Sequence, residues 1–232
     1  MWCVPRVEAH PDSFCEDVFL RKNVMEIKCL VLGMLRTNGY IAYNEETKKA
    51  VVIDPAAEPN KITDVITALG LKPEAVLLTH GHFDHMLAAD ALRQEYHIPI
   101  GLHADDAELL SDPKKNCSAT FFAAPYGISA DERFTDAQIL PYLDGTLTVL
   151  ATPGHTAGSC CYYAAEEGVL FSGDTLFSGS VGRTDLPTAK PAMLSVSIRE
   201  KLFTLPEDTT VLPGHGEDTT IGEEKRSNPY VM

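Results

Sequence analysis

The stretch Thr79-His80-Gly81-His82-Phe83-Asp84-His85 places three imidazoles and one carboxylate within six residues, directly after an apolar run. Imidazole and carboxylate together form the donor mixture that zinc, iron and manganese accept. Because positions two apart on a helix point to different sides, this spacing predicts a loop rather than a helix. Gly81 lets the backbone turn sharply, and Asp84 stands where the N-cap of a following helix is expected. The sequence therefore predicts a metal-binding loop between a strand and a helix.

Three further segments each end a strand-like run with a glycine and a candidate ligand: Gly154-His155-Thr156, Gly173-Asp174-Thr175 and Gly214-His215-Gly216. A tight turn after a buried strand brings side chains that are distant in sequence to one edge of a sheet. Taken singly, each ligand also has a structural interpretation, as a turn, a cap or a surface residue. Seven such residues at strand ends favour one shared metal site. Its predicted ligands are His80, His82, Asp84, His85, His155, Asp174 and His215.

Three other histidines and one aspartate are not part of these strand-and-glycine motifs. His10, His97 and His103 are interpreted as surface or locally hydrogen-bonded residues. Asp54, in Val-Ile-Asp-Pro, ends a strand and has two interpretations that the sequence leaves open. It either orients a metal ligand from behind or forms a structural turn.

The pattern of apolar residues predicts an α+β fold. Strands are expected at residues 27–35, 39–43, 50–53, 75–79, 99–103, 147–151, 160–164, 169–172 and 209–212. Helices are expected at 58–70, which Gly70 terminates, and at 84–96, 105–110 and 191–203. Residues 111–132 are expected to form a surface loop. Antiparallel strands with interspersed helices in both halves fit two sheets packed face to face and covered by helices outside.

Composition narrows the classes of partner. The chain of 232 residues has 44% hydrophobic residues and a formal net charge of −14, without a run of lysine or arginine. Such a charge repels nucleic acids and anionic membranes, so a small-molecule substrate is favoured over both. No stretch approaches the roughly 20 apolar residues of a membrane span. The sequence does not indicate an oligomeric state.

The cysteines and the first residues suggest a cytoplasmic protein with an added N-terminal segment. The six cysteines show no CxxC pair and no disulfide framework, so reduced thiols are expected. Strand alternation sends Cys160 and Cys161 to opposite faces, and neither is given a catalytic role. Residues 1–24 look unlike the rest and are interpreted as a leader, a flexible arm or a start-codon artefact. Residues 25–232 are predicted to form a single domain.

The motifs HGHFDH, GHT, GDT and GHG, in that order, resemble the metallo-β-lactamase superfamily from about residue 26 to residue 230. The segment Arg183-Thr184-Asp185 and the ending Gly-His-Gly-Glu-Asp-Thr-Thr-Ile-Gly resemble the glyoxalase II group, particularly its short bacterial members. The resemblance implies an αββα sandwich of two mixed sheets flanked by helices.

The resemblance also implies a dinuclear centre. His80, His82 and His155 would hold one metal, Asp84, His85 and His215 would hold the other, and Asp174 would bridge them together with a water or hydroxide. Zinc is the expected metal, with iron and manganese as alternatives. Asp84 and Asp174 are the predicted catalytic residues, because they would orient or share the hydroxide.

Substrate contacts are harder to predict. The sequence ends without the C-terminal helical region that helps bind glutathione in longer glyoxalase II enzymes. Arg183 can pair with a substrate carboxylate, or form an internal salt bridge to Asp185. Asn38, Tyr40 and Tyr126 are further candidates for lining the pocket, although packing explains them equally well.

The site chemistry favours thioester hydrolysis. Two cations about 3.5–4 Å apart lower the pKa of a shared water to near 7 and polarise a carbonyl group. A thiolate leaves without a proton, whereas an amine needs one, so a thioester suits a site without an obvious acid. We therefore expect a hydrolase of small S-acylglutathione-like thioesters. The alternatives are a mononuclear iron persulfide dioxygenase, a lactonase or β-lactamase, and a metal-binding module without catalysis.

Overall fold

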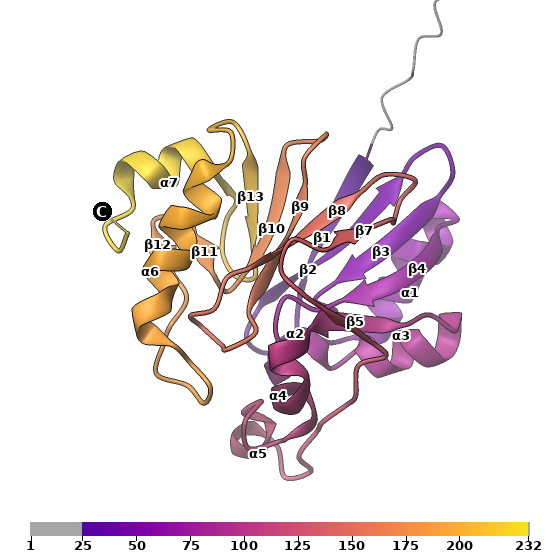
Figure 1. Ribbon diagram of the computed structural model, residues 1–232. Coiled ribbons are helices and arrows are strands. Elements are labelled where there is room, and N and C mark those ends of the chain that lie inside the picture. The colour runs from indigo at the N-terminus through magenta and orange to yellow at the C-terminus, as the bar shows by residue number, and fades with distance from the viewer. Residues whose placement is uncertain (1–24, 232) are drawn as a thin grey trace, which may run out of the picture.

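Two six-stranded sheets pack face to face in the computed structural model, which describes residues 25–231, and helices cover their outer faces (Figure 1). The first sheet has the spatial order β1 (Met25–Leu32), β2 (Thr37–Asn44), β3 (Lys49–Ile53), β4 (Lys72–Leu77), β5 (Ile100–His103) and β6 (Glu132–Phe134). The second has the order β14 (Thr219–Thr220), β13 (Thr210–Pro213), β10 (Val169–Gly173), β9 (Cys160–Ala164), β8 (Leu147–Ala151) and β7 (Ile139–Leu140). A small hairpin consists of β11 (Leu176–Phe177) and β12 (Ser180–Val181).

Both sheets are mixed, and this brings several strand ends to one edge. In the first sheet β1, β2 and β3 are antiparallel, whereas β3 to β6 are parallel neighbours. In the second sheet β10 pairs in parallel with β13, and β8 has the same direction because it is two antiparallel steps from β10. The carboxyl ends of β8, β10 and β13 therefore lie at the same edge.

Helices form the outer layers. Beside the first sheet lie α1 (Pro59–Leu69), α2 (Phe83–Met86) and α3 (Ala89–Tyr96), followed by η1 (Ala104–Asp106), α4 (Ala107–Ser111) and α5 (Ser118–Phe121). Beside the second lie α6 (Pro191–Glu200), η2 (Leu202–Thr204) and α7 (Ile221–Ser227). The predicted α+β class and αββα sandwich are confirmed.

Three apolar clusters hold the four layers together. Strand alternation divides neighbouring residues between them, since Val51 packs between the two sheets while Val52 packs under the first helical layer. Likewise Cys160 belongs to the cluster between the sheets and Cys161 to the cluster under α6. The two side chains lie on opposite faces of the strand, as alternation predicted, and both thiols are fully buried.

The predicted helix 84–96 is wrong in one respect, because it is divided into α2 and α3. The amide of Ala88 donates to the carbonyl of Pro55 at 2.9 Å, outside the helix, and so interrupts the helical hydrogen-bond ladder. Asp84 is also not the N-cap. Helix α2 begins at Phe83 with His82 as its cap residue, so Asp84 lies in the first turn.

Other boundaries shift by a few residues. The first strand ends at Leu32 because residues 33–36 form the turn into β2. The predicted helix 191–203 ends at Glu200 and is followed by η2. The predicted loop 111–132 contains α5, and the short elements β6, β7, β11, β12, β14 and α7 were not predicted. By contrast Gly70 ends α1 as expected, with a left-handed φ of 65°.

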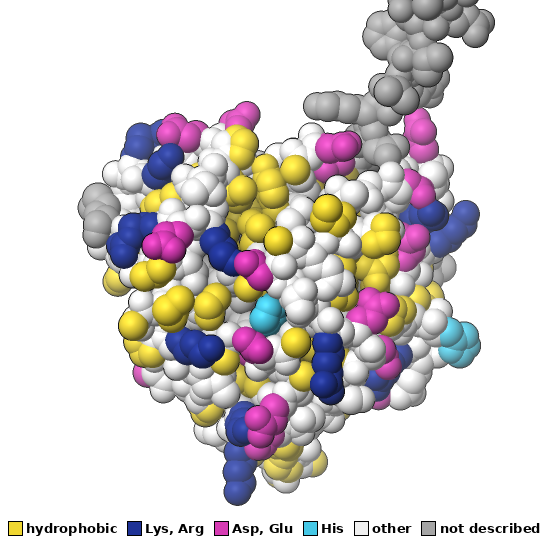
Figure 2. All heavy atoms as spheres, in the orientation of Figure 1, with side chains coloured by type: hydrophobic (Ala, Val, Ile, Leu, Met, Phe, Trp, Pro, Cys, Tyr) yellow, Lys and Arg dark blue, Asp and Glu magenta, His cyan; other side chains and the backbone are white. Residues whose placement is uncertain are grey.

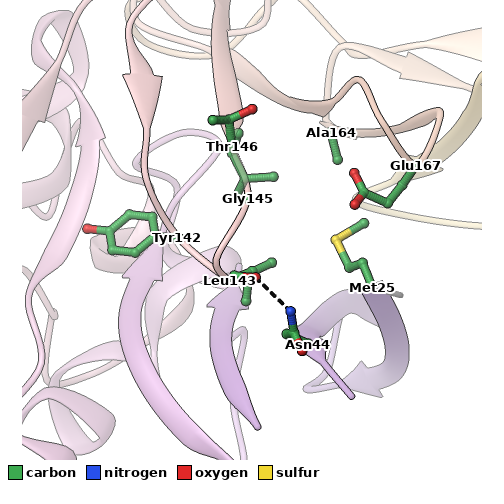
Figure 3. Close-up of a pocket in the computed structure, with 9 residues that line it drawn as sticks. Met25, Asn44, Tyr142, Leu143, Gly145, Thr146, Ala164 and Glu167 are labelled. Carbon is green, nitrogen blue, oxygen red and sulfur yellow. Dashed lines mark hydrogen bonds between the residues drawn. The ribbon is translucent and has the colours of Figure 1, made fainter. Parts of the chain in front are cut away.

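Hydrophobic side chains gather over α6 and neighbouring elements in Figure 2, and one histidine reaches the surface between α2 and α6. At the far end of β2, Asn44 donates to the carbonyl of Leu143 at 3.1 Å and so ties the two halves together (Figure 3).

Among the described residues, no helix has the length and apolarity needed to cross a bilayer. The predicted leader 1–24 and His10 lie outside the described residues.

Candidate metal centre

The first half of the chain presents its four candidate ligands from one short segment. His80 follows the buried strand β4, and His82 is the residue that starts α2. Asp84 and His85 lie within the single turn of that helix. Gly81 is required here, since a Cβ at this position would lie 2.5 Å from the Leu109 side chain. Close packing against α4 thus fixes the course of the loop.

The second half presents three ligands from three separate strand ends. His155 follows β8, Asp174 follows β10 and His215 follows β13. Gly173 lies against Thr79 so closely that a Cβ would meet the threonine hydroxyl oxygen at 2.2 Å. This approach brings the end of β10 against the end of β4 and joins the two halves of the site.

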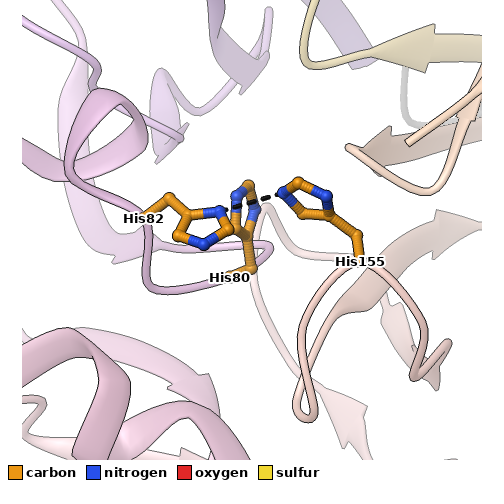
Figure 4. A group of neighbouring side chains, drawn as sticks. All are labelled: His80, His82 and His155. Atoms are coloured by element: carbon orange, nitrogen blue, oxygen red, sulfur yellow. Dashed lines mark hydrogen bonds between the residues drawn. The ribbon is translucent and has the colours of Figure 1, made fainter. Parts of the chain in front are cut away.

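Three imidazoles form the first group of ligands. Candidate ligand atoms of His80, His82 and His155 all lie within 4.8 Å of one another. The Nδ1 atom of His82 lies 2.9 Å from Nε2 of His155, and the two rings are nearly perpendicular, at 80°, beside His80 (Figure 4). All three side chains are buried. A cation at this position would find three nitrogen donors on rigid supports.

A second group lies next to the first. Ligand atoms of Asp84, His85 and His215 also lie within 4.8 Å of one another, with His215 Nε2 at 3.4 Å from Asp84 Oδ2. The carboxylate of Asp174 lies between the two groups, because one oxygen is 3.4 Å from His85 Nε2 and the other is 3.5 Å from His155 Nε2. The structure thus brings together all seven predicted ligands. Their assignment to individual cations stays a prediction.

Asp54 supports this arrangement from behind. Its carboxylate lies 2.9 Å from His85 Nδ1, and it accepts hydrogen bonds from the amide and hydroxyl of Thr79 at 2.8 and 2.7 Å. A proton held at Nδ1 leaves the Nε2 lone pair of His85 directed at the site. Asp54 follows β3 directly with a left-handed φ of 48°, and its contact with His85 agrees with the interpretation that it orients a ligand from behind.

Asp106 was not recognised in the sequence. This fully buried carboxylate accepts hydrogen bonds from the Gly81 amide at 3.0 Å, the Thr156 hydroxyl at 2.7 Å and the Gly158 amide at 2.7 Å. It therefore joins the loop of His80 and His82 to the loop of His155. Its position just after strand β5, at the same edge as the ligands, is the signal that could have identified it.

Asn38 and Tyr40 hold the turn that carries His215. The Asn38 amide donates to the carbonyls of Pro213 and Gly216 at 3.0 and 2.9 Å, and the Tyr40 hydroxyl donates to Pro213 at 2.7 Å. Both side chains are buried, and neither is among the residues that line the cavity over the site. In contrast to the expectation of substrate contacts, their polar groups are used to position a ligand-bearing turn.

Arg183 and Tyr126 differ in their relation to the cavity. Arg183 lines it, but its guanidinium forms a two-pronged, exposed ion pair with Asp185 at 2.6 and 2.7 Å. The carbonyl of Arg183 accepts a hydrogen bond from Nδ1 of His155 at 2.7 Å and thereby orients that ring. Tyr126 instead packs against the cluster under the first helical layer and does not line this cavity.

The electrostatics of the two ligand groups differ, since the first group is kept neutral and the second attracts positive charge. Burial lowers the pKa of His80 well below its usual value and lowers the pKa of His82 to about 3. Both rings are therefore neutral and have a free lone pair at ordinary pH. Burial also opposes protonation of His85, but the carboxylates of Asp54, Asp84 and Asp174 raise its pKa well above its usual value. The second group thus attracts positive charge.

Unpaired buried atoms show that the residues fit metal ions. Among the described residues, His80 Nε2, His85 Nε2 and Asp174 Oδ1 are buried without a hydrogen-bond partner. Leaving such atoms unpaired costs about 1–3 kcal/mol each, and a bound cation would satisfy them. His97 is exposed and His103 accepts a local hydrogen bond from the Asp105 amide, as expected for histidines outside the site.

The comparisons with known proteins agree with this geometry. The sequence profile described as the metallo-beta-lactamase superfamily matches residues 33–215. The probable metallo-hydrolase YqgX of Bacillus subtilis is 37% identical over 89% of this chain and 98% of its own length. The hydroxyacylglutathione hydrolase GloC of Haemophilus influenzae is 35% identical over the same shares.

Solved structures share the fold as well. The B3 metallo-beta-lactamase BLEG-1 superposes with a TM-score of 0.85 and 41% identity, over 89% of this chain and all of its own. The di-iron-bound form of TTHA1623 gives 0.79 and 39%, over 88% and 99%. ETHE1 from Myxococcus xanthus gives 0.73 and 31%, over 89% and 84%. The chain belongs to the metallo-beta-lactamase superfamily.

Proposed function

We propose that this protein is a hydrolase of the glyoxalase II type, which cleaves a small S-acylglutathione-like thioester at a dinuclear metal centre, with zinc as the expected metal. The observation that carries the proposal is the position of the Asp174 carboxylate between the two ligand groups. The relationship to GloC supports the choice of thioester substrates.

Two bound cations would lower the pKa of a water molecule and polarise the carbonyl group of the substrate. The residues of the chain supply the rest. His80, His82 and His155 would hold one side of the centre, and Asp84, His85 and His215 would hold the other. Asp84 accepts a hydrogen bond from the Thr37 hydroxyl at 3.1 Å, which fixes its carboxylate in the site. Apart from the candidate metal ligands, Arg183 is the one charged side chain among the described residues that line the cavity, so a leaving group that departs unprotonated is favoured.

A side-by-side assay of metal-replete protein tests this function. We expect two metals per chain and hydrolysis of S-acylglutathiones, with lactones and β-lactams cleaved at least about tenfold more slowly. Faster turnover of a lactone or a β-lactam would show that the protein is a lactonase or a β-lactamase instead. A protein that binds metal but turns over none of these substrates would be a metal-binding module.

One observation favours a second candidate, a persulfide dioxygenase with a single iron. The cluster contains a set of two imidazoles and one carboxylate, His80, His85 and Asp174, and this donor set is typical of mononuclear non-haem iron sites. Anaerobic purification followed by metal analysis separates the two candidates. One iron per chain, with oxygen uptake on glutathione persulfide and no thioester cleavage, would replace the hydrolase proposal.

The location of the protein is also a proposal. All four cysteines among the described residues are free thiols, which suits the reducing cytoplasm. Fractionation of cells that express the native gene would test this.

A further inference from the structure

The cavity over the metal ligands has a largely apolar wall. It has a volume of about 540 Å³, and its apolar lining residues are Leu35, Phe83, Phe121, Phe177, Val181 and Leu186. Two of these side chains are unusually open for their type, since Leu35 is 41% exposed and Phe121 is 47% exposed. Large apolar groups gathered around a concave site mark a surface that binds an apolar ligand.

The apolar wall begins directly at the ligands. The ring of Phe83, which precedes Asp84, lies 4.8 Å from the ring of Phe121. On the other side the ring of Phe177 lies 6.3 Å from the ring of His215, edge to face. An apolar group bonded to a carbonyl carbon held at the metal centre would therefore contact aromatic rings from its first methylenes onward.

The wall is held in place from behind. The buried carboxylate of Glu224 accepts hydrogen bonds from the Gly179 amide at 3.0 Å and the Thr219 hydroxyl at 2.7 Å, which fixes the hairpin that carries Phe177. On the opposite side the buried Asn116 accepts a hydrogen bond from the Ser118 amide at 2.9 Å and so fixes the start of α5. The cavity is thus preformed and loses little entropy on binding.

The low charge of the cavity lining also favours an apolar ligand. Apart from the candidate metal ligands, Arg183 is the one charged residue in the part of the cavity lining that the structure describes, and Asp185 already neutralises its guanidinium. Cys117 and Thr120 add only small neutral groups. Such a surface provides few hydrogen bonds or ion pairs for a charged or heavily hydroxylated acyl group.

We propose that the cavity selects thioesters with an unbranched apolar acyl chain of several carbons, rather than a short hydroxylated acyl group. The inference rests on the proposed thioesterase function. In that function the thiol carrier is a charged peptide thiol, so the acyl chain is the part of the substrate that matches the apolar wall. Leu35, Phe121 and Phe177 would be the specificity-determining residues.

A series of S-acylglutathiones from acetyl to hexanoyl tests this inference with metal-replete protein. Burial of one methylene contributes about 0.8 kcal/mol, so kcat/KM should rise about fourfold per methylene. Phe121→Ala and Phe177→Ala should flatten this dependence, so that hexanoyl turnover falls by a larger factor than acetyl turnover. Ile139→Ala is the matched control, because Ile139 is an apolar residue 63% exposed outside the cavity. A flat or falling series in the parent protein would overturn the inference while the thioesterase function stood.

A second measurement does not depend on turnover. S-alkylglutathione thioethers from methyl to hexyl cannot be hydrolysed, and their affinities can be measured by calorimetry on the same metal-replete protein. We expect the affinity to rise with chain length, and the rise to weaken in Phe121→Ala and Phe177→Ala. If no thioester is cleaved but the thioether affinities rise, the proposed function fails and the apolar site stands. Equal affinities along the series would overturn the apolar site.

Discussion

The two halves of the chain build the metal centre in different ways. The first half supplies four ligands from residues 80–85, where one strand end, one tight turn and one helical turn set their positions. The second half supplies three ligands from three separate turns after β8, β10 and β13. Each of these turns contacts a residue of the first half: Asp106 for the His155 loop, Thr79 for Gly173, and Asn38 with Tyr40 for the His215 turn.

The two halves differ in where the side chains that support their ligands come from. Asp54 and Thr37, which support the ligands of the first half, belong to that half themselves. The ligands of the second half depend on tertiary contacts across the interface between the sheets. Substitutions of these supporting residues in the first half should therefore weaken the hold on the second-half ligands, and the size of the effect should depend on how many contacts each substitution removes.

The largest effect is expected for Asp174→Ala, because this carboxylate faces both ligand groups. Loss of one metal ion removes several kcal/mol of transition-state stabilisation, so turnover should fall at least about a hundredfold. Metal analysis should show a lower metal content per chain. Asp64→Ala, at an exposed carboxylate on α1, is the control and should keep both properties. Full metal content in Asp174→Ala would show that Asp174 is not a ligand shared by two metals.

A smaller effect is expected for Asp106→Ala. It leaves two amides and one hydroxyl without their buried acceptor, which should lower the free energy of unfolding by about 2–4 kcal/mol. Chemical denaturation of the metal-free protein measures this change. Asp106→Asn keeps one acceptor oxygen and should lose about half as much. If both variants unfold like the parent protein, Asp106 does not join the two loops.

Asn38→Ala tests the support of the His215 turn. Partners that orient metal-bearing groups typically contribute 10–100-fold in affinity, so one of two metals should bind about tenfold or more weakly. Titration with a competing chelator measures both sites. Asn44→Ala is the matched control, since Asn44 is a buried asparagine on the same strand that also donates to a carbonyl of the second half, far from the ligands. Equal weakening in both variants would show a general loss of stability instead.

Tyr40→Phe should have the smallest effect. It removes the hydrogen bond to the Pro213 carbonyl, which still accepts one from Asn38. A hydrogen bond contributes about 1 kcal/mol net, so the free energy of unfolding should fall by no more than this, and the metal content should stay that of the parent. A loss of metal in Tyr40→Phe would show that the hydroxyl has a larger role than support of the turn.

Much of the fold could be predicted from local patterns. Gly70 ends α1 and the strand pairs around Val51 and Cys160 alternate as expected, because caps and pleats depend on neighbouring residues alone. The break between α2 and α3 could not be predicted, since it depends on the Pro55 carbonyl, which is distant in sequence. The same holds for the short strands β7 and β14, which exist only because a longer strand pairs with them.

The sequence by itself determined which side chains are candidate ligands, because their chemistry and their place after apolar strands are local properties. Only the tertiary structure decided how they are held. Asn38 and Tyr40, expected in the pocket, instead support the His215 turn, while the unrecognised Asp106 joins two ligand loops. The physical reason is that a hydrogen bond requires a partner within about 3 Å, and the folding of two sheets against each other alone brings such partners together.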